Sequence, residues 1–306
     1  MNTTWFLILN PISGNGKSKK YWNKISTLLT TNGIQFSFAF TAYSKHEVQL
    51  VQQAIKNGFT KIISVGGDGT LHHIVNGIMT QNNVKTSTIQ LAVIPIGTGN
   101  DWVKTYNIPT NIEKSILTIK KGTTILQDIG CLRTKNMRHV YFHNVAGIGY
   151  DGYVVYHLNA LKKFGKIAYL LSGLYGLLCY KKSTLTLKFN DQVLKEKCLM
   201  TIFGICKFSG GGMQFTKDVD PTDGLLDITV AKNFNLLDLL LNLRKLYTGA
   251  IVSHKKVSTY KTNQISITAN TEKEKNYIQA DGELIGSGLV KVTLVRRAIQ
   301  FVIPNC

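Results

Sequence analysis

Apolar and polar positions follow two periods in the first third of the chain. Short runs that suit strands cover residues 5–9, 34–40, 61–65 and 91–94. Between them, apolar residues recur at helical spacing over residues 21–29, 48–59 and 71–79. Strands that alternate with helices predict an α/β domain with a parallel sheet and helices on both faces. Such a sheet binds ligands at the carboxyl ends of its strands.

The pattern changes after about residue 126, where short strand-like runs dominate. They cover residues 141–146, 185–189, 199–203, 226–230, 265–269, 277–280 and 289–295. Helical spacing is confined to residues 158–179 and 236–247. This pattern predicts a second domain that is a mainly antiparallel β-sandwich.

Composition narrows the class of protein. The chain has 306 residues, of which 44% are hydrophobic and 17% charged, so a disordered chain is excluded. That length suggests about two domains. The five cysteines form no CxxC pair, and we expect reduced thiols in a cytoplasmic protein. The longest apolar stretch, residues 167–180, is shorter than the ~20 residues that a membrane-spanning helix needs.

Charge indicates an anionic partner. The formal net charge is +19, so nucleic acid, a phosphorylated ligand and an acidic membrane surface are candidates. Five lysines flank the apolar stretch of residues 167–180, namely Lys162, Lys163, Lys166, Lys181 and Lys182. Each lysine near an anionic bilayer contributes about 1 kcal/mol of binding free energy. We predict that they dock the chain on anionic membranes; the alternative for the apolar residues is packing on the sandwich.

Two glycine-rich loops follow predicted strands. Residues 66–70, Gly-Gly-Asp-Gly-Thr, open a helix whose N-terminus favours phosphate. Asp68 beside phosphates implies a nearby Mg²⁺, whereas a plain tight turn is the alternative interpretation. Residues 97–101, Gly-Thr-Gly-Asn-Asp, supply a second loop at the same sheet edge. Residues 10–18 fail the Walker A pattern, because Pro11 stands where that pattern requires glycine.

Two further patterns favour structural roles. Residues 147–152 match GxGxxG, but no acidic residue lies about 20 positions further on to bind a ribose hydroxyl. We therefore interpret these glycines as part of a turn. His72 and His73 are adjacent on a helix and point in different directions, so we expect helix surface positions rather than a metal site.

Acidic residues gather at two places in the second domain. Asp218, Asp220, Asp223 and Asp227 crowd one segment. They fit either a solvated turn or oxygen ligands for Mg²⁺. Asp281-Gly-Glu283 follows a predicted strand. It fits either a common turn or a general base presented to a substrate hydroxyl.

The motifs of the chain occur together in one order. They are residues 10–14, residues 66–70 with Asn76, and residues 95–101, 144–151, 210–213, 223–227 and 281–283. Over essentially the whole chain they resemble the diacylglycerol kinase catalytic-domain family, bacterial-type lipid kinases related to sphingosine kinases. NAD kinases and phosphofructokinases share Gly-Gly-Asp-Gly, so residues 97–101 and the later segments narrow the resemblance.

This resemblance implies an ATP- and Mg²⁺-dependent lipid kinase that phosphorylates a diacylglycerol-like hydroxyl at the membrane surface. The residues that it assigns to the nucleotide site are Asn10, Ser13, Gly14, Thr41, Gly66, Gly67, Asp68, Gly69, Thr70 and Thr98. Glu283 resembles the proton acceptor with Asp281 beside it, and Asp68 is a further catalytic candidate. Asp223 resembles a Mg²⁺ ligand, with backbone carbonyls near Asp220 and Leu225.

The sequence departs from the family at the metal site. Residues 222–223 are Thr-Asp where the family has an acidic pair, and residues 216–217 are Thr-Lys instead of Ala-Pro. The family also returns its C-terminal strand to the first domain. We therefore expect a nucleotide-binding domain at residues 1–126 with a return strand at about 290–306. A lipid-substrate domain is expected at residues 127–289.

Two rival functions remain open. One is a soluble kinase of the same superfamily that acts on NAD or another small alcohol. The other is a non-enzymatic binder of nucleotides or nucleic acid. The sequence lacks the aromatic and basic motifs of RNA-binding domains, so we expect no nucleic-acid partner. The expected partners are ATP, a lipid substrate and an anionic inner membrane surface, with a homodimer as a further candidate.

Overall fold

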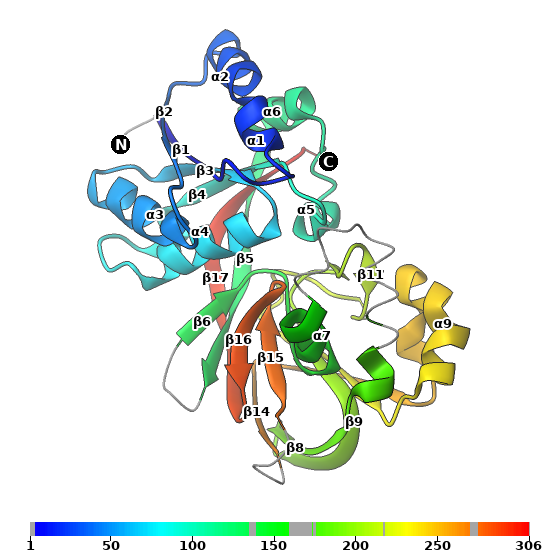
Figure 1. Ribbon diagram of the computed structural model, residues 1–306. Coiled ribbons are helices and arrows are strands. Elements are labelled where there is room, and N and C mark those ends of the chain that lie inside the picture. The colour runs from blue at the N-terminus through cyan, green and yellow to red at the C-terminus, as the bar shows by residue number, and fades with distance from the viewer. Residues whose placement is uncertain are drawn as a thin grey trace. The chain divides into compact units, whose positions relative to one another are not determined.

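The computed structural model describes residues 4–134, 139–158, 173, 176–216, 218–269 and 275–305 (Figure 1). The chain divides into two compact units. Unit 1 comprises Met1–Ile129 and Arg296–Cys306, and unit 2 comprises Gly130–Val295. The chain passes from one unit to the other within two long strands, β5 (Thr123–Thr134) and β17 (Val290–Ile303).

Unit 1 contains the predicted parallel sheet. Its strands are β1 (Trp5–Leu9), β2 (Phe36–Phe40), β3 (Lys61–Gly66) and β4 (Gln90–Pro95). They lie in the order β2-β1-β3-β4, and all three neighbouring pairs are parallel. The end of β17 adds a fifth parallel strand, because Gln300 and Phe301 pair with Gln90 and Leu91. The strands agree with the short apolar runs, since a sheet covered on both faces needs apolar side chains on both.

Helices cover both faces of this sheet (Figure 1). They are α1 (Lys17–Lys20), α2 (Trp22–Thr31), α3 (His46–Lys56), α4 (Asp68–Thr80), η1 (Thr86–Thr88), α5 (Asp101–Thr105) and α6 (Ile112–Lys121). The α2 and α6 helices bury Ile25, Leu29 and Ile116 against one face. The α3 and α4 helices pack on each other and on strands β1 and β3. The predicted helical periods therefore correspond to real amphipathic helices.

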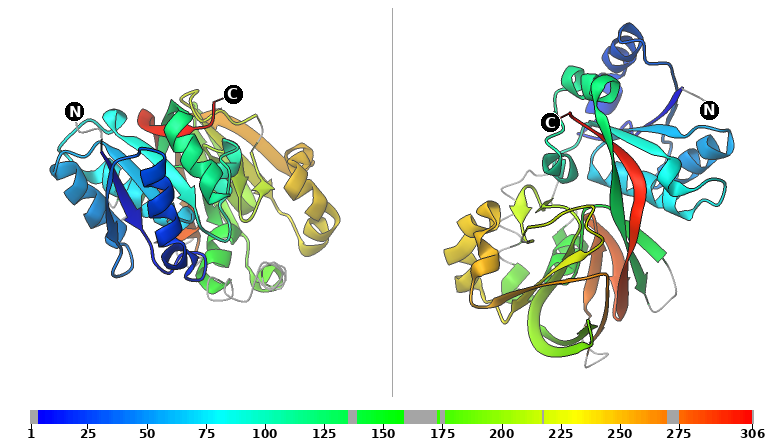
Figure 2. Two further views of the ribbon diagram at one scale, coloured as in Figure 1. Left: turned by 90° about the horizontal axis from the view of Figure 1, so that it is seen from above. Right: turned by 180° about the vertical axis from the view of Figure 1, so that it is seen from behind.

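Unit 2 is rich in antiparallel strands, as predicted (Figure 2). Besides the long strands, these are β6 (His139–Phe142), β7 (Val145–Gly149), β8 (Ser183–Phe189), β9 (Gln192–Gly204), β10 (Phe208–Ser209), β11 (Met213–Gln214), β12 (Leu226–Lys232), β13 (Val257–Thr262), β14 (Gln264–Ala269), β15 (Tyr277–Ala280) and β16 (Glu283–Ser287). The β9 strand connects two groups of strands. Its first half pairs with β8, and its second half lies between β7 and β12.

The helices of unit 2 pack beside these strands. They include α7 (Tyr150–Leu158), α9 (Leu236–Thr248) and the short η3 (Ala250–Ser253). The α9 helix matches its predicted extent, whereas most of the helix predicted at residues 158–179 lies outside the described residues. Within the described ranges, no helix is long and apolar enough to cross a membrane. The four cysteines described there, Cys131, Cys179, Cys198 and Cys206, are free thiols.

The structure corrects the strand expected at residues 141–146 and the position expected for His72. Residues 141–146 do not form one strand, because β6 ends at Phe142 and β7 begins at Val145. The two residues between them donate their backbone N–H groups to a side chain instead of to a neighbouring strand. His72 is not a surface residue. It is only 3% exposed, because α4 is covered by α3 as well as by the sheet.

The glycines of residues 147–152 were expected in a turn, but β7 is followed directly by α7. Gly147 lies within β7, Gly149 is its last residue, and Gly152 lies in the first turn of α7. A Cβ atom on Gly152 would stand 2.4 Å from the carbonyl oxygen of Tyr277. Glycine therefore lets α7 pack directly on the backbone of β15.

Candidate functional site

Three loops of unit 1 meet at the carboxyl edge of the parallel sheet. They follow β1, β3 and β4 at residues 10–16, 67 and 96–100. The amide of Asn10 donates to the carbonyl of Val65 over 3.2 Å, and the amide of Ile96 donates to that of Gly66 over 2.8 Å. Neighbouring parallel strands thus bring the two predicted glycine-rich loops together with the loop after β1, as expected for such a fold.

The loops approach each other backbone to backbone. A Cβ atom on Gly97 would stand 2.6 Å from Cα of Gly67, and one on Gly66 would stand 2.5 Å from Oγ1 of Thr70. Gly14 has a φ of +60°, and a Cβ atom there would stand 3.2 Å from the Ile96 side chain. Side chains larger than hydrogen do not fit at these contacts, so the glycines leave backbone N–H groups close together.

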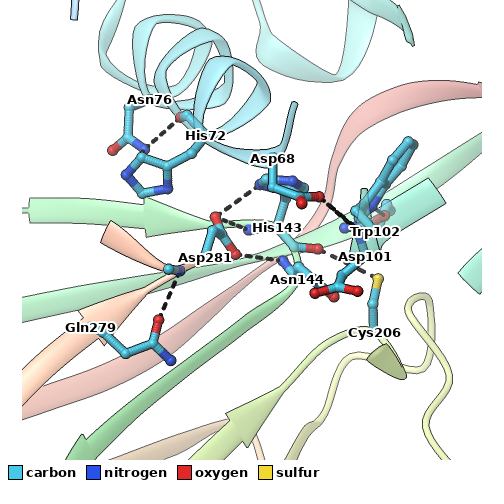
Figure 3. Close-up of polar contacts among 12 residues, drawn as sticks. Asp68, His72, Asn76, Asp101, Trp102, His143, Asn144, Cys206, Gln279 and Asp281 are labelled. Carbon is cyan, nitrogen blue, oxygen red and sulfur yellow. Dashed lines mark hydrogen bonds and ion pairs between the residues drawn. The ribbon is translucent and has the colours of Figure 1, made fainter. Parts of the chain in front are cut away.

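Asp68 connects two of these loops (Figure 3). Its Oδ1 atom accepts hydrogen bonds from the backbone amides of Asp101 at 2.9 Å and Trp102 at 3.4 Å. A Cβ atom on Gly99 would stand 2.9 Å from Oδ2 of Asp68. The first residue of α4 thereby holds the N-terminus of α5. Sequence reasoning connected Asp68 with a cation and missed this contact with the backbone.

Polar side chains surround the same edge. Asn10 donates from Nδ2 to Oε1 of the buried Glu47 over 3.2 Å, and its Oδ1 accepts the amide of Ile12 over 3.2 Å. Oγ of Ser13 lies 3.4 Å from Oγ1 of Thr70.

The remaining predicted residues lie close by. The amide of Thr41 donates to the carbonyl of Leu9, and the exposed Thr98 stands between Gly97 and Gly99. The ten residues assigned to the nucleotide site therefore all lie at or just beyond the carboxyl ends of β1, β2, β3 and β4. A helix N-terminus that begins at a glycine loop is suited to bind phosphate groups.

The Asp281 side chain in unit 2 is buried, and its carboxylate accepts hydrogen bonds from the backbone (Figure 3). Its Oδ1 accepts the amide of Asn144 over 3.0 Å, and its Oδ2 accepts that of His143 over 3.2 Å. The same Oδ2 lies 2.9 Å from Nδ1 of His143, and the Asp281 side chain is 1% exposed. These contacts explain the break between β6 and β7. They give Asp281 a role in holding the turn.

Gln279 ties this turn to α7. Its Oε1 accepts the amide of Gly282 over 2.9 Å, and its Nε2 donates to Oδ2 of Asp151 over 3.0 Å. Burial raises the pKa of Asp151 to about 6, although the hydrogen bond from Gln279 acts in the opposite direction. Sequence reasoning missed Gln279 and His143, because contacts between residues more than 120 positions apart leave no local pattern.

Glu283 differs from Asp281. It is the first residue of β16 and is partly exposed. Among the residues that the structure describes, its carboxylate makes no hydrogen bond or ion pair. Of the two acidic residues that flank Gly282, Glu283 is therefore the one whose oxygens can accept a proton from a bound molecule.

The acidic residues at 218–227 form hydrogen bonds and ion pairs with other groups of the protein. Oδ1 of Asp220 accepts the amide of Thr222 over 2.8 Å and its hydroxyl over 2.7 Å. Oδ1 of Asp223 accepts the amide of Leu225 over 2.9 Å, and its Oδ2 lies 2.9 Å from Nζ of Lys261. Burial raises the pKa of Asp227 to about 6, and the hydrogen bond to Asp223 raises the pKa of Lys261.

This arrangement does not fit a bound Mg²⁺ ion. Mg²⁺ needs oxygen ligands that face it at about 2.0–2.1 Å in an octahedron, and here an ammonium group faces the Asp223 oxygen. Within the described ranges, no group of three or more His, Cys, Asp or Glu residues could hold a metal ion. In this conformation the predicted ligands Asp223, Asp220 and Leu225 therefore do not form a Mg²⁺ site.

The two acidic segments of unit 2 lie along one row of its strands. The amide of Asp281 donates to the carbonyl of Val145. Val145 is paired with Gly204, and Gly204 is paired with Asp227. At about 4.8 Å per strand, roughly 15 Å of sheet separates Asp281 from Asp227. Sequence reasoning could not give this neighbourhood, because it depends on strand register.

Known proteins resemble both parts of the chain. Residues 4–132 match the diacylglycerol kinase catalytic domain, and residues 144–303 match the YegS C-terminal NAD kinase beta sandwich-like domain. A diacylglycerol kinase of Staphylococcus haemolyticus is 28% identical over 301 residues, which cover 98% of this chain and 88% of that protein. One of Bacillus subtilis is 26% identical over 302 residues, with 98% and 96% coverage.

The fold also matches solved structures. The crystal structure of a diacylglycerol kinase from Bacillus anthracis superimposes with a TM-score of 0.72 and 20% identity. The match covers 98% of this chain and 97% of that one. At this identity the likeness establishes the fold, an α/β region with an antiparallel β-rich part, as the sequence predicted.

The raised pKa of Asp151 predicts a pH-dependent stability. A carboxyl whose pKa rises from about 3.9 in the unfolded chain to about 6 in the folded protein destabilises the fold as pH increases through that window. Asp151→Asn keeps an acceptor for Gln279 and removes the charge. We expect the free energy of unfolding to increase by about 1–3 kcal/mol above pH 6 and to be unchanged near pH 4.

Urea unfolding at several pH values measures this difference. Asp191→Asn, in an exposed turn, is the matched control and should leave the pH dependence unaltered. An Asp151→Asn protein with the same slope as the parent would show that Asp151 does not titrate in this range.

Proposed function

We propose that this chain, which belongs to the diacylglycerol kinase catalytic-domain family, transfers the γ-phosphate of ATP to the hydroxyl of a diacylglycerol-like lipid. Membership makes it a lipid kinase with an alcohol group as acceptor. One observation carries the finer proposal. Glycine backbones from three loops gather beside the N-terminus of α4, where a polyphosphate is stabilised.

In this proposal unit 1 binds the nucleotide. The glycine amides and the first turn of α4 hold the phosphates, and the Asp68 carboxylate keeps the loop at residues 97–101 in place. Mg²⁺ bound with ATP would neutralise phosphate charge, and the Asp68 carboxylate would be the protein group beside it. Because phosphoryl transfer requires mainly positioning and charge stabilisation, a rigid set of loops supplies much of what the reaction needs.

In this proposal Glu283 of unit 2 is the general base. Its carboxylate accepts the proton of the lipid hydroxyl while the hydroxyl oxygen attacks the γ-phosphorus, and the bond from that phosphorus to the β,γ-bridging oxygen breaks to release ADP. The Glu283 carboxylate supports this role, because it makes no hydrogen bond or ion pair with the described residues. The buried Asp281 is then a positioning residue, since its hydrogen bonds to His143 and Asn144 fix the turn that carries Glu283.

We further propose that the enzyme works at an anionic membrane surface. Lys162, Lys163 and Lys166 lie outside the described residues. Among the other two predicted lysines, Lys181 is exposed, and Lys182 donates a hydrogen bond to Asn233.

The α9 helix gives independent support for membrane binding. Its exposed leucines, Leu237, Leu240 and Leu241, are 63%, 45% and 75% exposed. Leu246 on the opposite side is buried. The exposed Arg244 and Lys245 follow the leucines on the same helix. A helix that presents leucines beside cations to solvent fits the interface of an anionic bilayer, where the leucines enter the acyl region and the cations meet the headgroups.

The function is tested by phosphate transfer from labelled ATP to a panel of lipids, with NAD⁺ as a soluble acceptor. We expect transfer to a diacylglycerol-like lipid and none to NAD⁺. Glu283→Gln should lower kcat by about 10²–10⁴-fold and leave ATP affinity nearly unchanged, because only the proton acceptor is lost. The exposed Glu113→Gln is the matched control. Loss of ATP binding in Glu283→Gln would contradict the assignment.

The Asp68→Asn variant removes the negative charge of Asp68 and keeps its hydrogen bonds to the backbone. The amide oxygen can still accept the amides of Asp101 and Trp102, so we expect an unchanged melting temperature. Removal of the negative charge that would face the Mg²⁺ bound with ATP should lower the transfer rate by orders of magnitude. Thermal melts and initial rates measure the two effects. Near-normal turnover in the folded variant would remove the Asp68 charge from the mechanism.

Membrane binding is tested by co-sedimentation with vesicles. Leu237→Ser combined with Leu241→Ser should lower the affinity for anionic vesicles by about tenfold or more, because two apolar side chains no longer leave water. Leu117→Ser, which changes an exposed leucine of α6, is the matched control. We expect weak binding to neutral vesicles and a decrease with salt. Equal binding to neutral and anionic vesicles would contradict electrostatic docking.

A further inference from the structure

Lys261 lies directly opposite the acidic segment of unit 2. It belongs to β13, which is antiparallel to β12, and it is the register partner of Asp227. The segment before β12 contains Asp218, Asp220 and Asp223, so four aspartates occur within ten residues. The strand register therefore places an ammonium group beside a concentration of negative charge.

The ammonium group contacts three oxygens of this segment. Nζ of Lys261 lies 2.9 Å from Oδ2 of Asp223, 3.3 Å from the carbonyl oxygen of Asp218 and 3.6 Å from Oδ2 of Asp227. Two carboxylates and a main-chain carbonyl around one cation form the kind of oxygen set that a divalent metal takes in proteins. The three N–H donors of an ammonium group suit such a set equally well.

The conformation of this segment is satisfied without a metal. The remaining oxygen of Asp223 accepts the amide of Leu225, and Oδ1 of Asp220 accepts the amide and hydroxyl of Thr222. Gly224 adopts a φ of +79°, which permits the tight turn between these contacts. Only the charge of the carboxylates needs a cation, and Lys261 supplies one.

A divalent ion and Lys261 exclude each other at this place. Mg²⁺ would need the Asp223 oxygen at about 2.0–2.1 Å, whereas the ammonium nitrogen already stands 2.9 Å from it. Two cations that share one carboxylate oxygen would also repel each other. The presence of Lys261 therefore predicts a lower affinity for metal than the same aspartates would have without it.

We propose that Lys261 is an internal counter-ion that replaces a divalent metal at the acidic segment of residues 218–227. The segment then keeps its conformation when metal is absent. Lys261→Met converts it into a segment that needs an added cation, because the carboxylates lose their only tethered positive charge among the described residues. This inference goes beyond the proposed function, and its test uses neither ATP nor lipid, so either can fail without the other.

Thermal melts of the full chain test the proposal. They are recorded in excess EDTA and in excess Mg²⁺ at matched ionic strength. The parent protein should melt at the same temperature in both. Lys261→Met should melt about 2–6 °C lower in EDTA and recover most of that loss in Mg²⁺. The double variant with Asp223→Asn should lose the recovery, because the oxygen that receives Mg²⁺ is gone.

Two further variants serve as controls for the thermal melts. Lys188→Met removes an exposed lysine of β8 that makes no ion pair with the described residues, and it should show no Mg²⁺ response. If Lys261→Met does not fold in EDTA, Lys261→Arg must fold there, since it keeps the charge. A parent protein that is stabilised by Mg²⁺ would overturn the proposal. So would a Lys261→Met protein that melts like the parent in EDTA.

Discussion

The geometry of the glycine loops depends on the contact between the Asp68 carboxylate and the amides of Asp101 and Trp102. Backbone N–H groups at a helix start have no partner within the helix, and leaving them buried and unpaired is costly. Asp68, the first residue of α4, accepts two such N–H groups at the start of α5. Unit 2 uses the same solution, where Asp281 accepts the amides of His143 and Asn144. In each unit one carboxylate sets the path of a loop that is distant in sequence.

The parallel strands and most helices could be predicted because their signals are local. Buried strands of a covered sheet are apolar runs, and the α2, α3 and α6 helices each have one apolar face. The division into β6 and β7 could not be predicted, since it depends on Asp281, which lies 137 positions beyond Asn144. The burial of His72 was missed for a similar reason, because local spacing does not tell how many elements cover a helix.

The candidate site was predictable to a similar degree. Glycines and acidic residues after strands mark where ligands bind, so the members of both clusters were named from the sequence alone. The different roles of the residues within each cluster could not be predicted from the sequence. The sequence treats Asp281 and Glu283 alike, whereas the structure buries the Asp281 carboxylate against two backbone amides and the His143 ring and leaves the Glu283 carboxylate without a polar partner among the described residues. No sequence pattern indicated the contact of Lys261 with the acidic segment, because only the register of β12 and β13 brings Lys261 to Asp227.

The pairing of β17 with β4 has a consequence for how the protein is made. The Gln300 side chain also bonds to the carbonyl of Ser87, 213 positions earlier in the chain. On the ribosome, β4 therefore emerges with one edge unpaired. At about 5–20 residues per second that edge waits roughly 10–40 s for its partner strand. During that interval newly made unit 1 has an unpaired strand edge, the kind of edge at which strands of other chains can pair.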